Sequence, residues 1–275
     1  MSTTSNPLRR HPIVCFAVLA CVLGWNQYAL TWAGVMHDPD MTGFGPLLAA
    51  VIVAAGQGRA ELRRWARSLV HWGASPWLYG LALLAPIVLH IVIVAANTGF
   101  GAPLPTSDQL AGWTSLPGTF LAFLVLVGIG EEAGWTAFAA PILLRRHGVL
   151  TAWLILAGVR ILWHLPLVLT GEMPWTVAIL GNAGFQLVVL ALMVASRSQW
   201  TLAAVWHASL NAVGGGYFFS MVTGADLDRL FLLLALVYAL AGLAAYLLLR
   251  RAVPGPVAQP GADVPAHDPQ AHVSR

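Results

Sequence analysis

The sequence predicts an all-α, polytopic membrane protein with about eight transmembrane helices. Three observations lead to this fold class. Of the 275 residues, 58% are hydrophobic and 9% are charged, whereas soluble domains usually carry about 25% charged residues. Apolar runs close to the roughly 20 residues that a bilayer requires recur along the whole chain. The basic residues gather in alternate loops, as expected of a chain that crosses a membrane repeatedly.

The apolar runs define the predicted spans in chain order. Their ranges are 12–33, 42–57, 77–97, 117–144, 148–170, 175–195, 200–221 and 230–249. The second run is short for a full crossing. It either spans the membrane or re-enters the face from which it came, and re-entry would reverse the orientation of every later span.

The arginines favour eight full spans. All 14 basic residues are arginines. With a cytoplasmic N-terminus, the outer loops hold only Arg229 and the fifth span holds Arg160. The inner segments hold the rest: Arg9, Arg10, Arg59, Arg63, Arg64, Arg67, Arg145, Arg146, Arg197, Arg250, Arg251 and Arg275. This asymmetry follows the positive-inside rule. We therefore expect a multi-pass plasma-membrane protein with both termini in the cytoplasm. Topology explains the net charge of +3, so nucleic acid is not an expected partner.

The chain reads as one domain with two disordered ends. We expect residues 1–11 and the Pro- and Gly-rich tail 252–275 to be disordered in the cytoplasm, and 12–251 to form the transmembrane domain. Between the second and third spans, arginines interleave with apolar side chains at helical spacing: Leu62, Trp65, Leu69 and Trp72. This pattern predicts an amphipathic helix in the inner membrane interface, which either anchors the topology or guides a substrate.

Ionisable side chains inside the predicted spans are the strongest functional signal. The fourth span carries Glu131 and Glu132, and one ionised carboxylate near the bilayer centre costs roughly 2.5–3.5 kcal/mol on insertion scales. The fifth span carries Arg160 and His164, and the seventh carries His207 followed four residues later by an asparagine, so each pair lies on one helix face. Adjacent glutamates point about 100° apart on a helix, so one can act on a substrate while the other braces a neighbouring helix.

These residue types suit amide hydrolysis without a covalent intermediate. A carboxylate can act as a general base on water, and an imidazole can donate a proton or stabilise negative charge. The amide of Asn211 can donate to an oxyanion. Zn²⁺ held by Glu131, His164 and His207 is the alternative, and spacing alone does not separate the two. A lone intramembrane histidine or amide more often makes a helix–helix contact than a functional site. We interpret the remaining polar residues of the predicted spans in this way: His90, Asn182 and Gln186.

At these residues the sequence resembles the CPBP family of intramembrane proteases, which includes the CAAX endopeptidases and the bacterial Abi, or bacteriocin-immunity, branch. The family is marked by Glu-Glu-x-x-x-Arg, aromatic-x-x-x-His and His-x-x-x-Asn, each on its own transmembrane helix. Here "EEAGWTAFAAPIL" begins at Glu131, "WHLPL" holds His164, and "HASLN" begins at His207. The resemblance covers roughly 40–250, with its motif core at 117–221.

The resemblance implies a helical fold whose cavity opens toward the cytoplasm. Glu131 would activate the hydrolytic water with help from Glu132. His164 and His207 would polarise or position that water, and Asn211 would stabilise the oxyanion. Family members are labelled metalloproteases, and a metal-free, glutamate-dependent mechanism has also been proposed for the CAAX enzymes. No cofactor is therefore assigned, and Zn²⁺ is retained as an alternative.

Two positions depart from the family pattern. Thr136 stands where the first motif has arginine, and Arg160 stands where the second has an aromatic residue. We expect Arg160 to supply the missing charge and to pair with Glu131 or Glu132. In the alternative, Arg160 extends toward the membrane surface and the site has lost its activity.

Three classes of function remain. The first is an endopeptidase that cleaves a peptide or membrane-protein substrate near the cytoplasmic face, within membrane lipid. The second is a catalytically inactive immunity or binding protein that keeps the pocket, an alternative that the threonine at position 136 supports. The third is a transporter with a proton relay, which we disfavour because the sequence shows no repeat symmetry and no pair of broken helices related by it.

Overall fold

The computed structural model describes residues 6–252, which form helices joined by turns and loops, with no β-strand among them. The all-α fold class is therefore confirmed. Residues 1–5 and nearly all of the predicted tail lie outside the described residues. Within the N-terminal segment predicted to be disordered, Pro7–Arg10 forms a one-turn helix, α1. Its start is fixed because the Asn6 side chain accepts a hydrogen bond from the Leu8 amide and proline occupies the first helical position.

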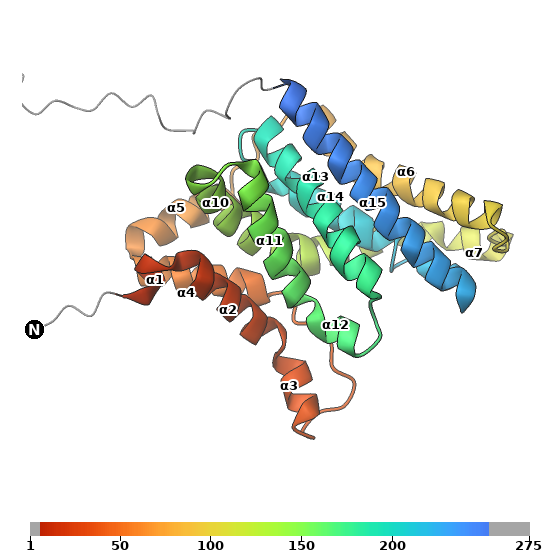
Figure 1. Cartoon of the computed structure of the whole chain (residues 1–275), viewed down its shortest axis with the longest axis horizontal. Coiled ribbons are helices and arrows are strands. Elements are labelled where there is room, and N and C mark those ends of the chain that lie inside the picture. Colours follow the sequence, from red (N-terminus) through yellow and green to blue (C-terminus); the bar gives the residue numbers. More distant parts are fainter. Residues whose placement is uncertain (1–5, 253–275) are drawn as a thin grey trace, which may run out of the picture.

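The N-terminal part of the bundle is built on small residues. α2 (Pro12–Gly24) and α3 (Asn26–Trp32) form a pair bent by 53°, and α4 (Gly45–Gln57) packs beside α2 (Figure 1). A Cβ on Gly45 would meet the backbone of Gly24. Small residues allow this close approach between helix backbones, which is how helices associate in a membrane.

The amphipathic helix predicted between the second and third spans is present. It is α5 (Arg59–Leu69), whose four arginines are exposed while Trp65 is buried. The Trp65 indole N–H donates to the Ala133 carbonyl at 3.1 Å, and the Trp200 indole N–H donates to the Ser68 carbonyl at 3.1 Å. Two tryptophans thus fix α5 against the rest of the molecule.

A long central helical stretch carries the two glutamates. It contains, in order, α7 (Ser107–Ala111), the 3-10 turn η1 (Gly112–Ser115), α8 (Leu116–Phe123), the π-helical turn η2 (Leu124–Ile129), α9 (Gly130–Gly134), the π-helical turn η3 (Trp135–Ala139) and α10 (Ala140–Arg146). A Cβ on Gly130 would meet the Gly43 carbonyl, and one on Gly134 would meet the Pro46 backbone. Glycine at these two positions therefore lets α9 lie directly on the start of α4.

The remaining helices complete the bundle. They are α6 (Pro76–Gly99), α11 (Val149–Trp163), α12 (Leu165–Leu169), the π-helical turn η4 (Val177–Gly181), α13 (Asn182–Ala195), α14 (Trp200–Val213), the 3-10 turn η5 (Phe218–Met221) and α15 (Ala225–Ala252). One apolar cluster contains residues of α2, α4, α10 and α11, and a second contains residues of α6 and α15; α13 and α14 contribute to both. Glu132 on α9 binds α11 and α14.

Among the described residues, four helices are long and apolar enough to cross a membrane: Pro76–Gly99, Ser107–Arg146, Val177–Ala195 and Ala225–Arg251. The bent pair Pro12–Gly24 and Asn26–Trp32 raises the number to five. This supports a membrane protein, but the predicted count of eight is not confirmed. A helix lies within each of the eight predicted ranges, but α4, α11 and α14 have only 13, 15 and 14 residues.

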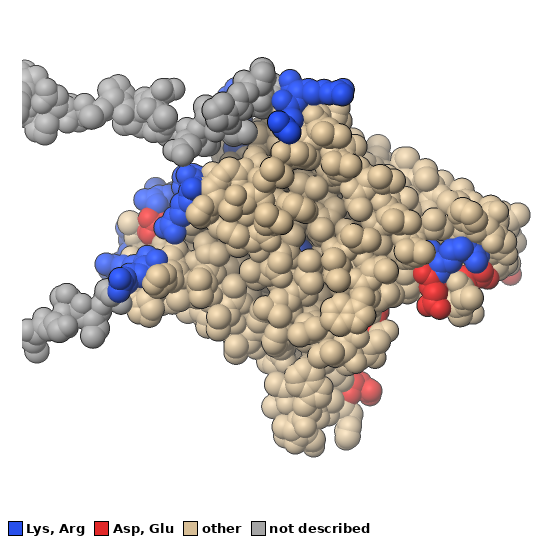
Figure 2. All heavy atoms as spheres, viewed as in Figure 1, with Lys and Arg blue, Asp and Glu red and all other residues tan. Residues whose placement is uncertain are grey.

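Charged side chains are unevenly placed on the surface. In Figure 2 the visible arginines gather near α1, α5 and α10 and at the end of α15, whereas most visible acidic residues lie away from these helices. Arg229 near the start of α15 is the exception, and it pairs with Asp226 at 2.5 Å. The predicted orientation across the membrane remains a prediction.

Candidate active site

The two glutamates lie on α9 and are both buried. This five-residue α-helical segment is flanked by the π-helical turns η2 and η3. A π-helical turn inserts an extra residue and so changes which side chains of the following turns share a face, and such turns are frequent at functional sites. The local backbone thus departs from a regular α-helix on each side of the glutamate pair.

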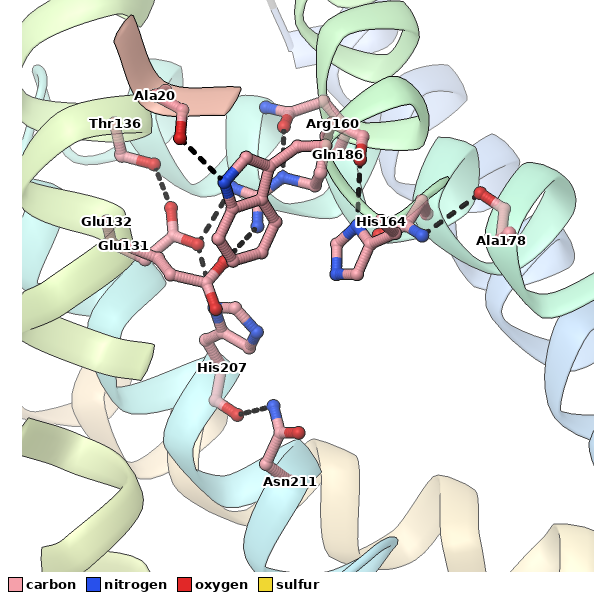
Figure 3. A network of polar contacts seen from close by, with 12 residues as sticks. Ala20, Glu131, Glu132, Thr136, Arg160, His164, Ala178, Gln186, His207 and Asn211 are labelled. Atoms are coloured by element: carbon pink, nitrogen blue, oxygen red, sulfur yellow. Dashed lines mark hydrogen bonds and ion pairs between the residues drawn. The ribbon is translucent and has the colours of Figure 1, made fainter. Parts of the chain in front are cut away.

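Glu132 accepts hydrogen bonds from three helical segments (Figure 3). Arg160 on α11 donates from Nη2 to Oε1 at 2.8 Å, and His207 Nδ1 on α14 lies 2.8 Å from the same oxygen. The Thr136 hydroxyl donates to the other oxygen, Oε2. Because a carboxylate only accepts, Nδ1 is the protonated nitrogen of His207 in this contact. Both oxygens of Glu132 are therefore engaged, and this carboxylate ties α9, α11 and α14 together.

Glu131 accepts fewer hydrogen bonds than Glu132. Its Oε2 accepts one hydrogen bond within the described chain, from Nη1 of Arg160 at a long 3.4 Å. The side chain is 5% exposed, whereas that of Glu132 is fully buried. Adjacent glutamates thus have different roles in the structure, as their angular separation on a helix predicts: Glu132 is saturated by protein donors, and Glu131 retains acceptor capacity.

Arg160 lies between the two carboxylates and is 1% exposed. Its Nε donates to Oε1 of Gln186 on α13 at 3.3 Å, and its guanidinium carbon lies 4.8 Å from the centre of the Phe185 ring and 5.4 Å from that of Trp135. Both aromatic faces stabilise a cation at such distances. The predicted pairing of Arg160 with the glutamates is therefore present, and its predicted alternative, extension toward the membrane surface, does not occur in this structure.

His164 and Asn211 stand apart from the carboxylates. His164 is buried, and its Nδ1 lies 2.8 Å from the carbonyl of Arg160, one turn earlier on the same helix. Asn211 donates to the carbonyl of His207, also one turn earlier, at 3.1 Å. In Figure 3 the His164 ring lies apart from His207 and the glutamates, and its marked contact is with Arg160. The structure thus brings Glu131, Glu132, Arg160 and His207 into direct contact, and places His164 and Asn211 around them.

The donor set only partly matches the predicted metal site. Potential ligand atoms of Glu131, Glu132 and His207 lie within 4.8 Å of one another, but His164 is not in this group. Two carboxylates and one imidazole are chemically suitable ligands for Zn²⁺. However, both carboxylates already bind the guanidinium of Arg160, and a divalent cation at the same oxygens would be repelled by it.

Sequence reasoning missed the aromatic walls around Arg160. Phe185 and Trp135 belong to long apolar runs in which nothing distinguishes them from residues that face lipid. The interhelical hydrogen bond expected for Gln186 exists, but its partner Arg160 was not predicted. The one expected for Asn182 is wrong among the described residues, because its amide donates to Ala178 of its own helical segment. Thr136 was expected only as a missing arginine, whereas its hydroxyl binds Glu132. His90, for which we expected a structural role, bonds to the Pro86 carbonyl of its own helix at 2.8 Å, and its ring contacts Phe219 and Tyr238.

Comparison with known proteins gives one family. Residues 113–213 match the model of the family described as Type II CAAX prenyl endopeptidase Rce1-like. The matched segment contains the glutamate pair, Arg160, His164, His207 and Asn211, and it begins and ends close to the helices that carry them. No curated protein matches the chain.

Proposed function

We propose, from the premise that the chain belongs to the family of CAAX-type intramembrane proteases, that it hydrolyses peptide bonds near the cytoplasmic face with a water activated by Glu131. The observation that carries this proposal is the unequal binding of the two glutamates. All the donors around Glu132 hold it in place, whereas Glu131 keeps a carboxylate oxygen for a water molecule.

The reaction needs one base and one oxyanion donor. Glu131 takes a proton from the water as the water oxygen attacks the carbonyl carbon of the peptide bond, and the tetrahedral intermediate carries the negative charge on the former carbonyl oxygen. Collapse of the intermediate breaks the C–N bond, and the proton on Glu131 passes to the leaving amine. No covalent bond to the protein forms.

His207 is placed to act on the oxyanion. Its Nδ1 is held by Glu132, so the ring orientation is fixed and Nε2 is left for the substrate. In its protonated form, Nε2 donates to the developing oxyanion. His164, which directly follows α11, would position the water or substrate. The Asn211 amide gives one N–H to the carbonyl of His207, and its second N–H would donate to the oxyanion.

We further propose that this hydrolysis does not require a metal. Arg160 supplies the positive charge that lowers the free-energy cost of burying the two carboxylates. A zinc ion would supply this charge in the metal-dependent alternative. The alternative is a Zn²⁺ site made by Glu131, His207 and a further ligand, for which Arg160 would have to withdraw. A metal chelator distinguishes the two.

The test is cleavage of a library of lipidated reporter peptides by the purified, detergent-solubilised protein. Glu131→Gln should reduce the rate by about 10²–10⁴-fold, the usual contribution of a general base, and a chelator should leave the wild-type rate unchanged. Asn182→Ala is the matched control, because Asn182 is also an intramembrane polar residue but bonds only Ala178 of its own helical segment, at 3.0 Å. Loss of activity with the chelator would overturn the metal-free mechanism. A folded wild type that cleaves nothing would favour the inactive immunity or binding protein.

A further inference from the structure

A basic cavity lies at the arginine-rich end of the molecule, away from the glutamates. It has a volume of about 260 Å³ and is lined by residues of α1, α2, α10 and α11 and the loop between the last two: Arg10, His11, Pro12, Ile13, Val14, Leu143, Arg146, His147 and Ile155. Two guanidinium groups and two imidazoles thus converge from segments far apart in the sequence. None of the described residues that line the cavity is acidic.

The first turn of α2 adds backbone donors to the same cavity. His11 is the residue that precedes this helix, and its side chain makes no capping hydrogen bond. The amides of Ile13 and Val14 lack the intrahelical acceptors that later amides have, and they donate to no group in the described part of the chain. The N-terminus of the 13-residue helix α2, where the helix dipole is positive, therefore lines the same cavity as Arg10 and Arg146.

We propose that this cavity binds the phosphate of an anionic phospholipid headgroup. Guanidinium groups and helix N-termini are the two kinds of donor that proteins use most directly for phosphate. Basic pockets between transmembrane helices at the cytoplasmic side are known to take anionic headgroups. The arginines around α1 and α10 predict that this end faces the cytoplasm, where anionic lipids are enriched.

The apolar surface next to the cavity indicates a lipid rather than free phosphate. Val14, which lines the cavity, is 62% exposed, and Val18 and Val22 continue the same exposed face along α2. On the neighbouring helix α11, Leu154 is exposed beside Ile155 of the cavity wall. α2 and α11 are in contact. An acyl chain attached to the bound headgroup would lie along this exposed apolar surface, away from the charged end.

The test compares how variants of two adjacent arginines bind lipid. Native mass spectrometry and thermal unfolding of the purified full-length protein would be measured with phosphatidylglycerol, with phosphatidylcholine and with inorganic phosphate. Arg146→Gln should weaken phosphatidylglycerol binding by about tenfold, the effect of losing one charge-assisted hydrogen bond. Arg145→Gln is the matched control, because it removes the same charge from the next residue of α10, which does not line the cavity. Arg145→Gln should bind like the wild type.

Three results would overturn the proposal. The first is equal weakening by both arginine variants, which would show attraction to a general basic surface. The second is that the wild-type protein binds phosphatidylcholine as well as phosphatidylglycerol. The third is thermal stabilisation by inorganic phosphate as large as that by phosphatidylglycerol, which would assign the cavity to a free anion.

A further variant tests the shape of the cavity. Val14→Trp narrows the cavity without changing its charge and should also weaken phosphatidylglycerol binding. Normal binding by this variant would contradict the site.

Discussion

Glu131 and Glu132 are adjacent in the chain, yet their side chains have unequal partners. Three donors hold Glu132, and one long contact reaches Glu131. A buried carboxylate without partners is expensive, so the donors around Glu132 make its burial tolerable. At the residue scale, the site therefore pairs Glu132, whose carboxylate is fixed by hydrogen bonds, with Glu131, whose carboxylate is less constrained.

Arg160→Ala should cause loss of folded protein, because it leaves two buried carboxylates without their shared cation. Breaking a buried ion pair from one side typically costs about 3–5 kcal/mol. The free energy of unfolding, or the yield of monodisperse protein where unfolding is irreversible, measures the effect. Arg64→Ala is the control, since Arg64 and its partner Glu61 have side chains that are 71% and 39% exposed, and it should change stability by about 1 kcal/mol or less.

Restoring the arginine at the family position should rescue that variant. Thr136→Arg in the Arg160→Ala background returns a cation to the same carboxylate, since Thr136 already binds Glu132. The same change in the wild type should destabilise, because Thr136 is fully buried and a second cation would join Arg160. A double-mutant cycle tests the coupling. If the double variant inserts normally but shows no rescue, the exchange of positions is wrong.

At the element scale, glycines decide how closely α9 lies against its neighbours. Gly134→Ala should destabilise the protein by about 1–3 kcal/mol, because the added methyl group would meet the Pro46 backbone. Gly118→Ala is the matched control in α8: nothing lies within 4 Å of its added Cβ, so it should be neutral or stabilise by up to about 1 kcal/mol. Thermal unfolding of both variants provides the measurement, and equal effects would contradict the close packing of α9.

The amphipathic helix α5 is coupled to the glutamate helix by a hydrogen bond from Trp65. Trp65→Phe keeps an aromatic ring but removes the donor to the carbonyl of Ala133, which directly follows Glu132. We expect a stability loss of about 1 kcal/mol and faster amide hydrogen exchange around α9. Trp72→Phe is the control, because Trp72 is exposed. Unchanged exchange in Trp65→Phe would mean that α5 does not support the position of α9.

At the scale of the whole molecule, orientation and number of crossings need a direct measurement. In a variant with Cys15 and Cys21 replaced, single cysteines at Ser198 and Gly171 should be labelled by a membrane-impermeant reagent from opposite sides of the membrane, Ser198 from the cytoplasm. The eight-span prediction places one loop inside and the other outside. Labelling from the same side would show that the intervening segment 175–195 does not cross.

The sequence predicted the helical class, the amphipathic helix and the charge pairing, because each depends on composition or on a cost that must be compensated. Burying Glu131 and Glu132 required a cation, and Arg160 was the only basic residue within a predicted span. Which glutamate is saturated was not predictable, since it depends on the π-helical turns around α9. The second run was recognised as short, but the lengths of α11 and α14, 15 and 14 residues, were not predicted, because an apolar run does not reveal where its helix ends.

The supply of this cation from α11 has a consequence for biosynthesis. A ribosome makes Glu131 and Glu132 before Arg160, and His207 later still. An arginine at position 136 would accompany the acids into the bilayer on their own helix, but here that helix carries no cation at their level. The glutamates therefore reach the translocon ahead of their neutralising partner, which lies 28 residues further along the chain from Glu132. We expect the central helix to wait there until α11 emerges, so that the two enter the lipid as a pair.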